Sequence, residues 1–148
     1  MKRLVSASII IVLISLSPAS AALNDSPGDV KEITLKEAET LIGKKDAYFF
    51  DVRGDSHYVS GHLPGAVSVP FEWKTQGEIT ERECRIDLSV LPEDKESIVV
   101  FYSFGPTTLK SYKAYKAAVA AVQAGYKNVC FLKAGYDGWL NSAQAKRQ

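Results

Sequence analysis

Short apolar runs alternate with segments of helical composition along most of this 148-residue chain. Ala47–Val52 (AYFFDV), Ile98–Tyr102 (IVVFY) and Asn128–Leu132 (NVCFL) are each typical of a buried strand, because they are rich in β-branched and aromatic residues. A shorter apolar run covers Ala66–Val69. Strands that alternate with helices form a parallel sheet with helices on both faces. The sequence therefore predicts an α/β domain.

The helices between these runs are indicated by their end signals and composition. Thr34 and Glu37 form a capping box, which predicts a helix over Leu35–Ile42. A second helix, rich in Ala and Lys, is expected over about Thr108–Ala124, and a last short helix near the C-terminus. Phe71–Ser97 mixes charges with Gly and Pro, so we expect a loop with one short helix there.

The first residues have the layout of a secretory signal peptide. A basic start precedes the uncharged stretch Leu4–Leu16, and Ala19–Ala21 is a small-residue cleavage pattern. The alternative is an uncleaved membrane anchor, since Leu4–Leu23 is nearly long enough to span a bilayer. The serines in this stretch and the early cleavage pattern favour cleavage after Ala21.

This interpretation divides the chain into three parts. Residues 1–21 are the expected signal peptide, residues 22–32 a flexible lead-in, and residues 33–148 the domain. Export in this form predicts a periplasmic protein, with secretion as the alternative and no membrane contact after cleavage.

Charge and cysteine content exclude several classes of protein. The net charge of +1 gives no basic surface of the kind that nucleic-acid binders use. The two cysteines and two histidines are scattered, so no metal site is predicted, and nothing indicates a cofactor. A disulfide between Cys84 and Cys130 is open to an exported protein, but their spacing does not decide it.

The loop after Tyr102 is the expected functional site. In parallel α/β sheets, ligands bind at the carboxyl ends of the strands, where loops lead into helix N-termini. Ser103–Thr108 (SFGPTT) occupies such a position, between the most apolar strand and the longest predicted helix.

Four further segments resemble the signatures of rhodanese-like domains, a family of sulfurtransferases. Phe50–Arg53 (FDVR) and Gly61–Ala66 (GHLPGA) resemble its D-x-R and G-H-[IL]-P-G-A motifs, and Gly125–Val129 and Ala134–Trp139 resemble its closing segment. The matches follow the family's order and spacing over about Ile33–Leu140. The resemblance implies a parallel five-stranded sheet with helices on both faces, and a sulfurtransferase ancestry.

The resemblance also implies a missing catalytic group. Active members carry a persulfide on a cysteine just after the fourth strand. Phe101–Ala114 resembles a subgroup written F-Y-C-x-G-P-x-C-x-K-S-Y-K-A, which places Ser103 at the catalytic position and Thr108 at a second cysteine. A gapless alternative register places Tyr102 there instead. A hydroxyl stays protonated near neutral pH and forms no counterpart of a persulfide, so the family reaction is expected to be lost.

A loop of this kind still favours anions. Backbone N–H groups that converge at the start of a helix attract negative charge without a thiol. We expect the loop to bind a small oxyanion such as sulfate, thiosulfate or phosphate weakly. The alternatives are that the loop is a structural turn that binds only water, or that the domain binds a protein partner. The residues expected to form this anion-binding loop are Ser103, Phe104, Gly105, Pro106, Thr107, Thr108 and the nearby cation Lys110.

The remaining motif residues have a structural interpretation and a catalytic one. Asp51, Arg53 and His62 are expected to brace the loops around the pocket, as the resemblance suggests. A hydrolase triad of Ser103, His62 and Asp51 is the alternative, although Ser103 lacks a G-x-S-x-G turn.

The cysteines leave a different alternative open. Cys84 stands close to Arg82 and Arg85, which could lower its pKa and allow it to carry sulfur in place of the missing residue. Cys130 lies within a buried strand and is expected to be a core residue.

Overall fold

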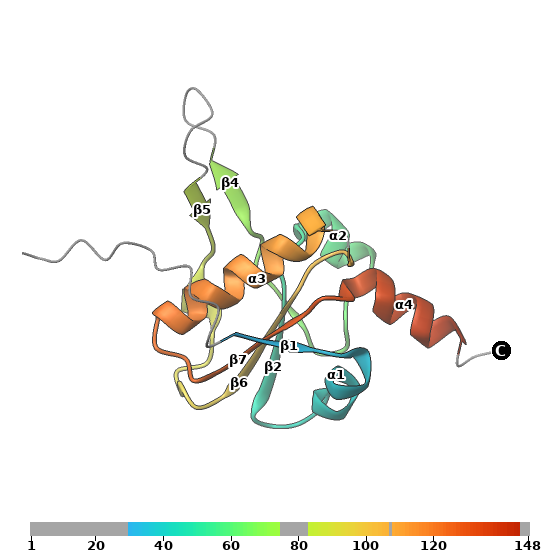
Figure 1. Ribbon diagram of the computed structural model, residues 1–148, viewed down its shortest axis with the longest axis horizontal. Coiled ribbons are helices and arrows are strands. Elements are labelled where there is room, and N and C mark those ends of the chain that lie inside the picture. The colour runs from blue at the N-terminus through green and yellow to red at the C-terminus, as the bar shows by residue number, and fades with distance from the viewer. Residues whose placement is uncertain (1–29, 75–82, 107, 146–148) are drawn as a thin grey trace, which may run out of the picture.

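The computed structural model describes residues 30–74, 83–106 and 108–145, which form a parallel five-stranded sheet with helices on both faces. The strand order is β1-β7-β6-β2-β3 (Figure 1), and a separate antiparallel pair is formed by β4 and β5. This confirms the predicted fold class. The strands of the main sheet are β1 (Val30–Ile33), β2 (Ala47–Asp51), β3 (Val67–Ser68), β6 (Ile98–Tyr102) and β7 (Asn128–Leu132).

The central strand of the sheet is β6, the most apolar run in the sequence. It pairs along its full length with β2 on one side and with β7 on the other. Phe101 and Tyr102 are fully buried at its carboxyl end. The loop that follows Tyr102 therefore leaves the middle of the sheet, where neighbouring elements surround it on several sides.

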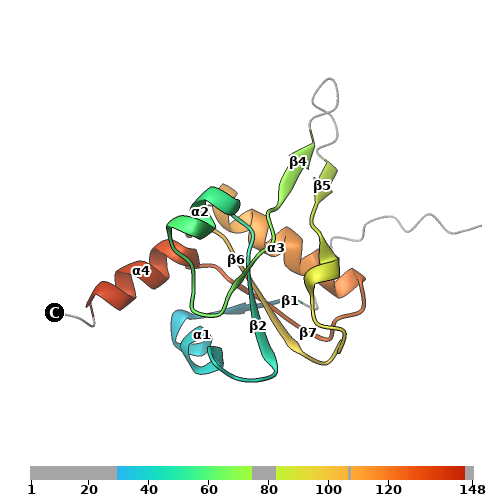
Figure 2. The same cartoon turned by 180° about the vertical axis from the view of Figure 1, so that it is seen from behind.

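Each face of the sheet is covered by different helices. Helix α3 (Thr108–Gln123) packs on one face, and α1 (Leu35–Leu41) and α4 (Gly135–Ala145) pack on the other (Figures 1 and 2). The capping box predicted for α1 is present, since the Thr34 hydroxyl accepts from the backbone N–H of Glu37 and the Glu37 carboxylate accepts from that of Thr34.

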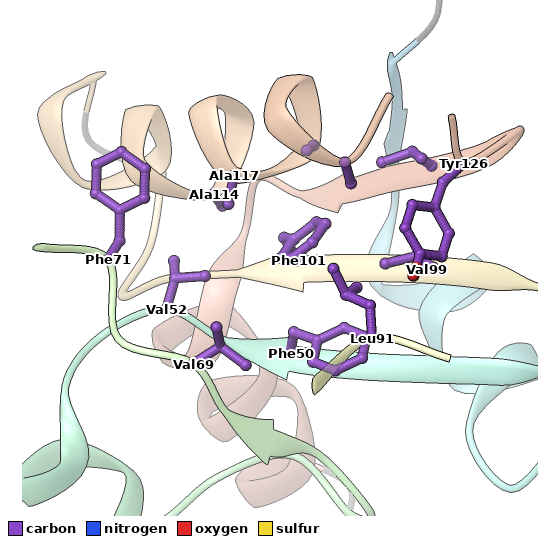
Figure 3. Close-up of a cluster of buried hydrophobic side chains, with 13 residues drawn as sticks. Phe50, Val52, Val69, Phe71, Leu91, Val99, Phe101, Ala114, Ala117 and Tyr126 are labelled. Atoms are coloured by element: carbon purple, nitrogen blue, oxygen red, sulfur yellow. The ribbon is translucent and has the colours of Figure 1, made fainter. Parts of the chain in front are cut away.

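Helix α3 approaches the sheet closely because small residues line its inner face. Four fully buried alanines lie on this face, and Figure 3 shows Ala114 and Ala117 above Phe101 and Val52. Tyr115 of the same helix meets the ring of Phe131 edge-on, whereas Tyr112 is 40% exposed.

Three parts of the structure differ from the sequence prediction. Val30–Ile33 form strand β1, so residues 30–32 belong to the sheet and not to the flexible lead-in expected there. The polar stretch before the G-H-L-P-G-A motif forms a helix, α2 (Asp55–Ser60). The segment 71–97 contains the expected short helix, the 3₁₀ helix η2 (Leu88–Val90), but also a hairpin of β4 (Glu72–Lys74) and β5 (Glu83–Arg85) that was not expected.

The hairpin projects from the body of the domain in both views (Figures 1 and 2). Within the described residues, no helix has the length and apolar character needed to cross a membrane. The predicted signal peptide lies outside the described part of the chain.

Candidate functional site

Ser103 lies directly after β6 and is buried beneath the surrounding loops. The residue is 1% exposed, and its Oγ has no hydrogen-bond partner among the described residues. A buried hydroxyl without a partner costs about 1–3 kcal/mol. Such a group is rare in native proteins and indicates a position that a ligand or a water molecule can satisfy.

The start of α4 holds the backbone of this loop in place. The N–H of Tyr136 donates to the carbonyl of Ser103 at 2.8 Å, and the N–H of Asp137 donates to the carbonyl of Phe104 at 2.6 Å. In a planar trans peptide the N–H points opposite to the carbonyl. The N–H groups of Phe104 and Gly105 therefore point away from α4, and into the same side of the loop.

This contact requires a glycine at the first position of α4. Gly135 has a φ of +60°, and a Cβ there would lie 2.6 Å from the Ser103 carbonyl oxygen and 2.7 Å from the Gly105 nitrogen. A side chain at position 135 would push the loop and the helix apart.

The expected series of backbone N–H donors in the loop is interrupted at one position. Pro106 has no N–H, so it cannot donate to an anion as part of a continuous series. Thr107 lies outside the described residues, and so do the side chains of Thr108 and Lys110, which belong to the first turn of α3. Within the loop, the structure describes Ser103, Phe104, Gly105 and Pro106, and the first three can contribute backbone N–H groups.

Asp51 and Arg53 form a buried ion pair beside this loop. Arg53 Nε lies 2.9 Å from Asp51 Oδ1, and Arg53 Nη2 lies 2.6 Å from Oδ2, with the two side chains 3% and 0% exposed. Burial disfavours the charge of Arg53, but the hydrogen bond and ion pair with Asp51 outweigh this effect and raise the pKa of the guanidinium.

Arg53 also joins three separate parts of the chain. Its Nη2 donates to the carbonyl of Gly61 at 2.5 Å, and its guanidinium carbon lies 4.1 Å from the ring centroid of Tyr136. The guanidinium is also 5.7 Å from the Phe104 ring, so Lys110 is not the only cation near the loop. Arg53 thus connects the end of β2 with the turn at Gly61 and with α4.

The alternative triad of Ser103, His62 and Asp51 is not assembled. The Asp51 carboxylate binds Arg53, and the exposed His62 ring stacks on Tyr58, with centroids 3.9 Å apart and Nδ1 2.9 Å from the Tyr58 carbonyl oxygen. Ser103 Oγ has no partner among the described residues, so neither His62 nor another described side chain is placed to accept its proton. The triad interpretation is therefore wrong.

One neighbour of the loop was missed by the sequence analysis. The ring of His57, on α2, meets the ring of Phe104 edge-on with centroids 4.6 Å apart. The only sequence signal for this contact was a polar stretch between two motifs, and its helix has no buried residue that could mark an apolar face.

The described residues offer no alternative thiol close to Ser103. Cys130 is free and buried in β7, and burial raises the pKa of its thiol, which makes it a poor nucleophile. No disulfide therefore forms at Cys130. The backbone of Cys84 lies opposite Trp73 in the β4–β5 hairpin, and its side chain lies outside the description. No metal-binding group of His, Cys, Asp and Glu occurs among the described residues.

Replacing Ser103 with alanine is expected to stabilise the protein in the absence of anions. The alanine removes a buried hydroxyl that lacks a partner, so the free energy of unfolding should rise by about 1 kcal/mol. Urea unfolding of the two proteins in a buffer without oxyanions measures this difference. A loss of stability would mean that Oγ is hydrogen-bonded after all.

The sequence of this chain is similar to those of known proteins. The family model for the rhodanese-like domain matches residues 34–142. The chain is 33% identical over 113 residues to the uncharacterized protein YibN of Escherichia coli, covering 74% of this chain and 67% of YibN. It is 29% identical to thiosulfate sulfurtransferase 18 of Arabidopsis thaliana, covering 76% of this chain and 80% of that protein.

Two further comparisons bear on length and fold. The chain is 27% identical to the tRNA uridine(34) hydroxylase of Hamiltonella defensa. The match covers 74% of this chain but only 28% of the length of that enzyme. The human single-domain sulfurtransferase TSTD1 superimposes with a TM-score of 0.51 and 20% identity, over 74% of this chain and 95% of that one. The BH2092 protein of Bacillus halodurans superimposes with a TM-score of 0.55 and 23% identity, over 76% and 73% of the two chains. The motifs, the strand order and the family match together show that this chain belongs to the rhodanese-like domain family.

Proposed function

We propose that this rhodanese-like domain does not transfer persulfide sulfur and instead binds a small oxyanion in the Ser103–Thr108 loop, outside the cytoplasm. The observation that carries the proposal is the residue at position 103. It is a serine that is 1% exposed, and its buried Oγ has no hydrogen-bond partner among the described residues.

The loss of sulfur transfer follows from the chemistry of the hydroxyl. Sulfur transfer needs a group that attacks as an anion, holds the sulfur and then releases it. A thiolate does all three, because thiols at helix starts ionise near neutral pH. The Ser103 hydroxyl has no base beside it among the described residues, and an oxygen–sulfur adduct is not a stable carrier.

Anion binding is supported by the electrostatics of the loop. The N–H groups of Phe104 and Gly105 point to the same side, and α3 begins a few residues later with the positive end of a 16-residue helix. The Ser103 hydroxyl adds a donor that is otherwise unsatisfied. Tetrahedral oxyanions with several acceptor oxygens fit such a set of donors, and sulfate, thiosulfate and phosphate are the candidates.

Calorimetric titration with these three anions tests the binding. We expect weak binding by the unmodified protein, and Ser103→Ala should weaken it by about tenfold, since a hydrogen bond to a charged group contributes about 1.5–3 kcal/mol. Ser56→Ala, at an exposed serine on α2, is the matched control and should bind as the unmodified protein does. Absence of binding heat, or equal affinity for Ser103→Ala, would contradict the proposal.

Two further measurements address the remaining parts of the proposal. A thiosulfate-to-cyanide assay of the unmodified protein should show no turnover, and turnover that disappears in Cys84→Ala would establish the alternative sulfurtransferase. The choice of thiosulfate is guided by the name of the Arabidopsis relative. Cell fractionation with an antibody should find the processed protein in the periplasm, as the signal-peptide pattern suggests; an unprocessed cytoplasmic protein would exclude export.

A further inference from the structure

A groove opens at the end of the sheet opposite to the Ser103 loop. Its volume is about 750 Å³, and it lies between the start of β2, the edge strand β3 and the segment that precedes β6. Ser103 follows the carboxyl end of β6, whereas the groove is lined by Asp46, before β2, and Ser97, before β6. Since these strands are parallel, Asp46 and Ser97 lie at the end of the sheet opposite to the loop, and the groove extends from there along β2 to Phe50 and Val67.

The walls of the groove are apolar and exposed. Tyr48, Val67 and Val90 line it, and they are 39%, 44% and 44% exposed. They make up half of the large apolar side chains that are exposed in the described part of the chain, and they come from β2, β3 and η2. Single exposed apolar residues are ordinary on a surface, but apolar side chains that gather around one concave site indicate a contact surface. Buried Phe50 also lines the groove.

The rim of the groove is acidic. Asp46, Glu93 and Asp94 line it together with a single cation, Lys45, although the whole chain has a net charge of +1. Lys95 follows immediately, but its ammonium lies 3.6 Å from the ring centroid of Tyr126. The groove therefore combines an apolar interior with a local excess of negative charge.

We propose that this groove docks a segment of another protein that carries apolar side chains flanked by Lys or Arg. The apolar side chains cover Tyr48, Val67 and Val90, and the basic groups lie near Asp46 and Glu93. Opposite charges at the rim of an apolar contact select the partner and accelerate its association. This docking does not depend on anion binding at Ser103, because the two sites share no residue.

Two synthetic peptides test the proposal with the full-length protein. The first is a ten-residue peptide that alternates valine with lysine, and the second has each lysine replaced by glutamate. In titrations followed by NMR of the isotope-labelled protein, the lysine peptide should shift the amide signals of Tyr48, Val67 and Val90. The glutamate peptide should leave these signals unchanged.

Variants separate the charged and the apolar contributions. Removal of the two carboxylates in the double variant Asp46→Asn and Glu93→Gln should weaken the lysine peptide by about tenfold, as expected for two exposed ion pairs. Tyr48→Ser removes an apolar side chain from the groove, so it should weaken the binding of any peptide that binds through apolar contact. Val59→Ser is the matched control, since Val59 is 81% exposed on α2 and does not line the groove.

Several outcomes would overturn the proposal. These are no signal change at millimolar lysine peptide, equal binding of both peptides, and signal changes that map to other elements. Changes at Tyr48 and Val67 on raising the protein concentration alone would show that the groove binds a second copy of this chain instead. Circular dichroism of each variant checks that it is folded.

Discussion

Replacing Ser103 with cysteine is expected to give this protein a thiosulfate-to-cyanide sulfur transfer that we expect the unmodified protein to lack. The loop backbone is held by α4 and the Asp51–Arg53 pair lies beside it, so the substitution supplies a thiol nucleophile at the position that the family resemblance assigns to the catalytic cysteine. The cysteine thiolate attacks the outer sulfur of thiosulfate, and sulfite leaves with the electrons of the broken S–S bond. Cyanide then takes the outer sulfur as thiocyanate and regenerates the thiolate.

The expected gain is on the order of 100-fold or more over the unmodified protein, because removal of a nucleophile normally abolishes the reaction that it carries. Turnover is measured as thiocyanate formed per minute, and mass spectrometry of the variant after thiosulfate treatment should find one added sulfur atom. Ser103→Ala is the control and should remain inactive. An inactive but folded Ser103→Cys protein would show that the loop cannot present a thiolate, and that more than the nucleophile has been lost.

The second large effect is expected from Arg53→Met. This substitution leaves the fully buried Asp51 carboxylate without its cation, and breaking a buried ion pair in this way costs about 3–5 kcal/mol. The loss is a large fraction of the stability of an ordinary domain, which is about 5–15 kcal/mol. Urea unfolding should therefore show a greatly reduced midpoint, and the protein should be prone to unfold near physiological temperature.

Two comparisons separate the charge effect from lost packing. The double variant Asp51→Asn and Arg53→Met removes both charges, so it should recover a measurable part of the lost stability. Lys31→Met breaks the ion pair of Lys31 with Glu37, which is exposed, and should have a far smaller effect. Equal losses for Arg53→Met and Lys31→Met would mean that burial of the Asp51–Arg53 pair has no energetic consequence.

The sequence predicted the parts of the fold that depend on continuous burial. Strands β6 and β7 were located with the correct bounds, because IVVFY and NVCFL are short apolar runs of β-branched and aromatic residues, which is typical of a buried strand. The α1 capping box was equally clear, since its two side chains interact within a few residues of each other. These signals are local, and no tertiary information is needed to interpret them.

The elements that were missed carry no such local signal. Strand β1 has the burial pattern of an exposed edge, with only Ile33 fully buried, so its VKEI sequence resembles a polar lead-in. Helix α2 has no buried residue. It is attached to the following segment by tertiary contacts such as the hydrogen bond from Tyr58 Oη to the carbonyl of Ala66. The β4–β5 hairpin is recognised by backbone pairing between two separate segments, which a local sequence pattern does not reveal.

The candidate site shows the same division. The sequence located Ser103 at the end of a central strand and placed Asp51 near Arg53, because both conclusions follow from strand ends and short spacings. The contacts of Arg53 with Gly61 and Tyr136 depend on segments that are distant in sequence. The motifs likewise do not show that Ser103 Oγ lacks a hydrogen-bond partner among the described residues, since this depends on every element that surrounds the loop.

The attachment of α4 to the Ser103 loop has a consequence for how such a domain changes during evolution. The bonds from Tyr136 and Asp137 involve main-chain carbonyls alone, and the close approach at Gly135 involves main-chain atoms of the loop. These contacts of the chain at position 103 thus do not involve the side chain that stands there. A mutation from cysteine to serine can therefore end one activity of such a domain without removing the main-chain contacts of the loop. Selection can then retain the loop for a different function.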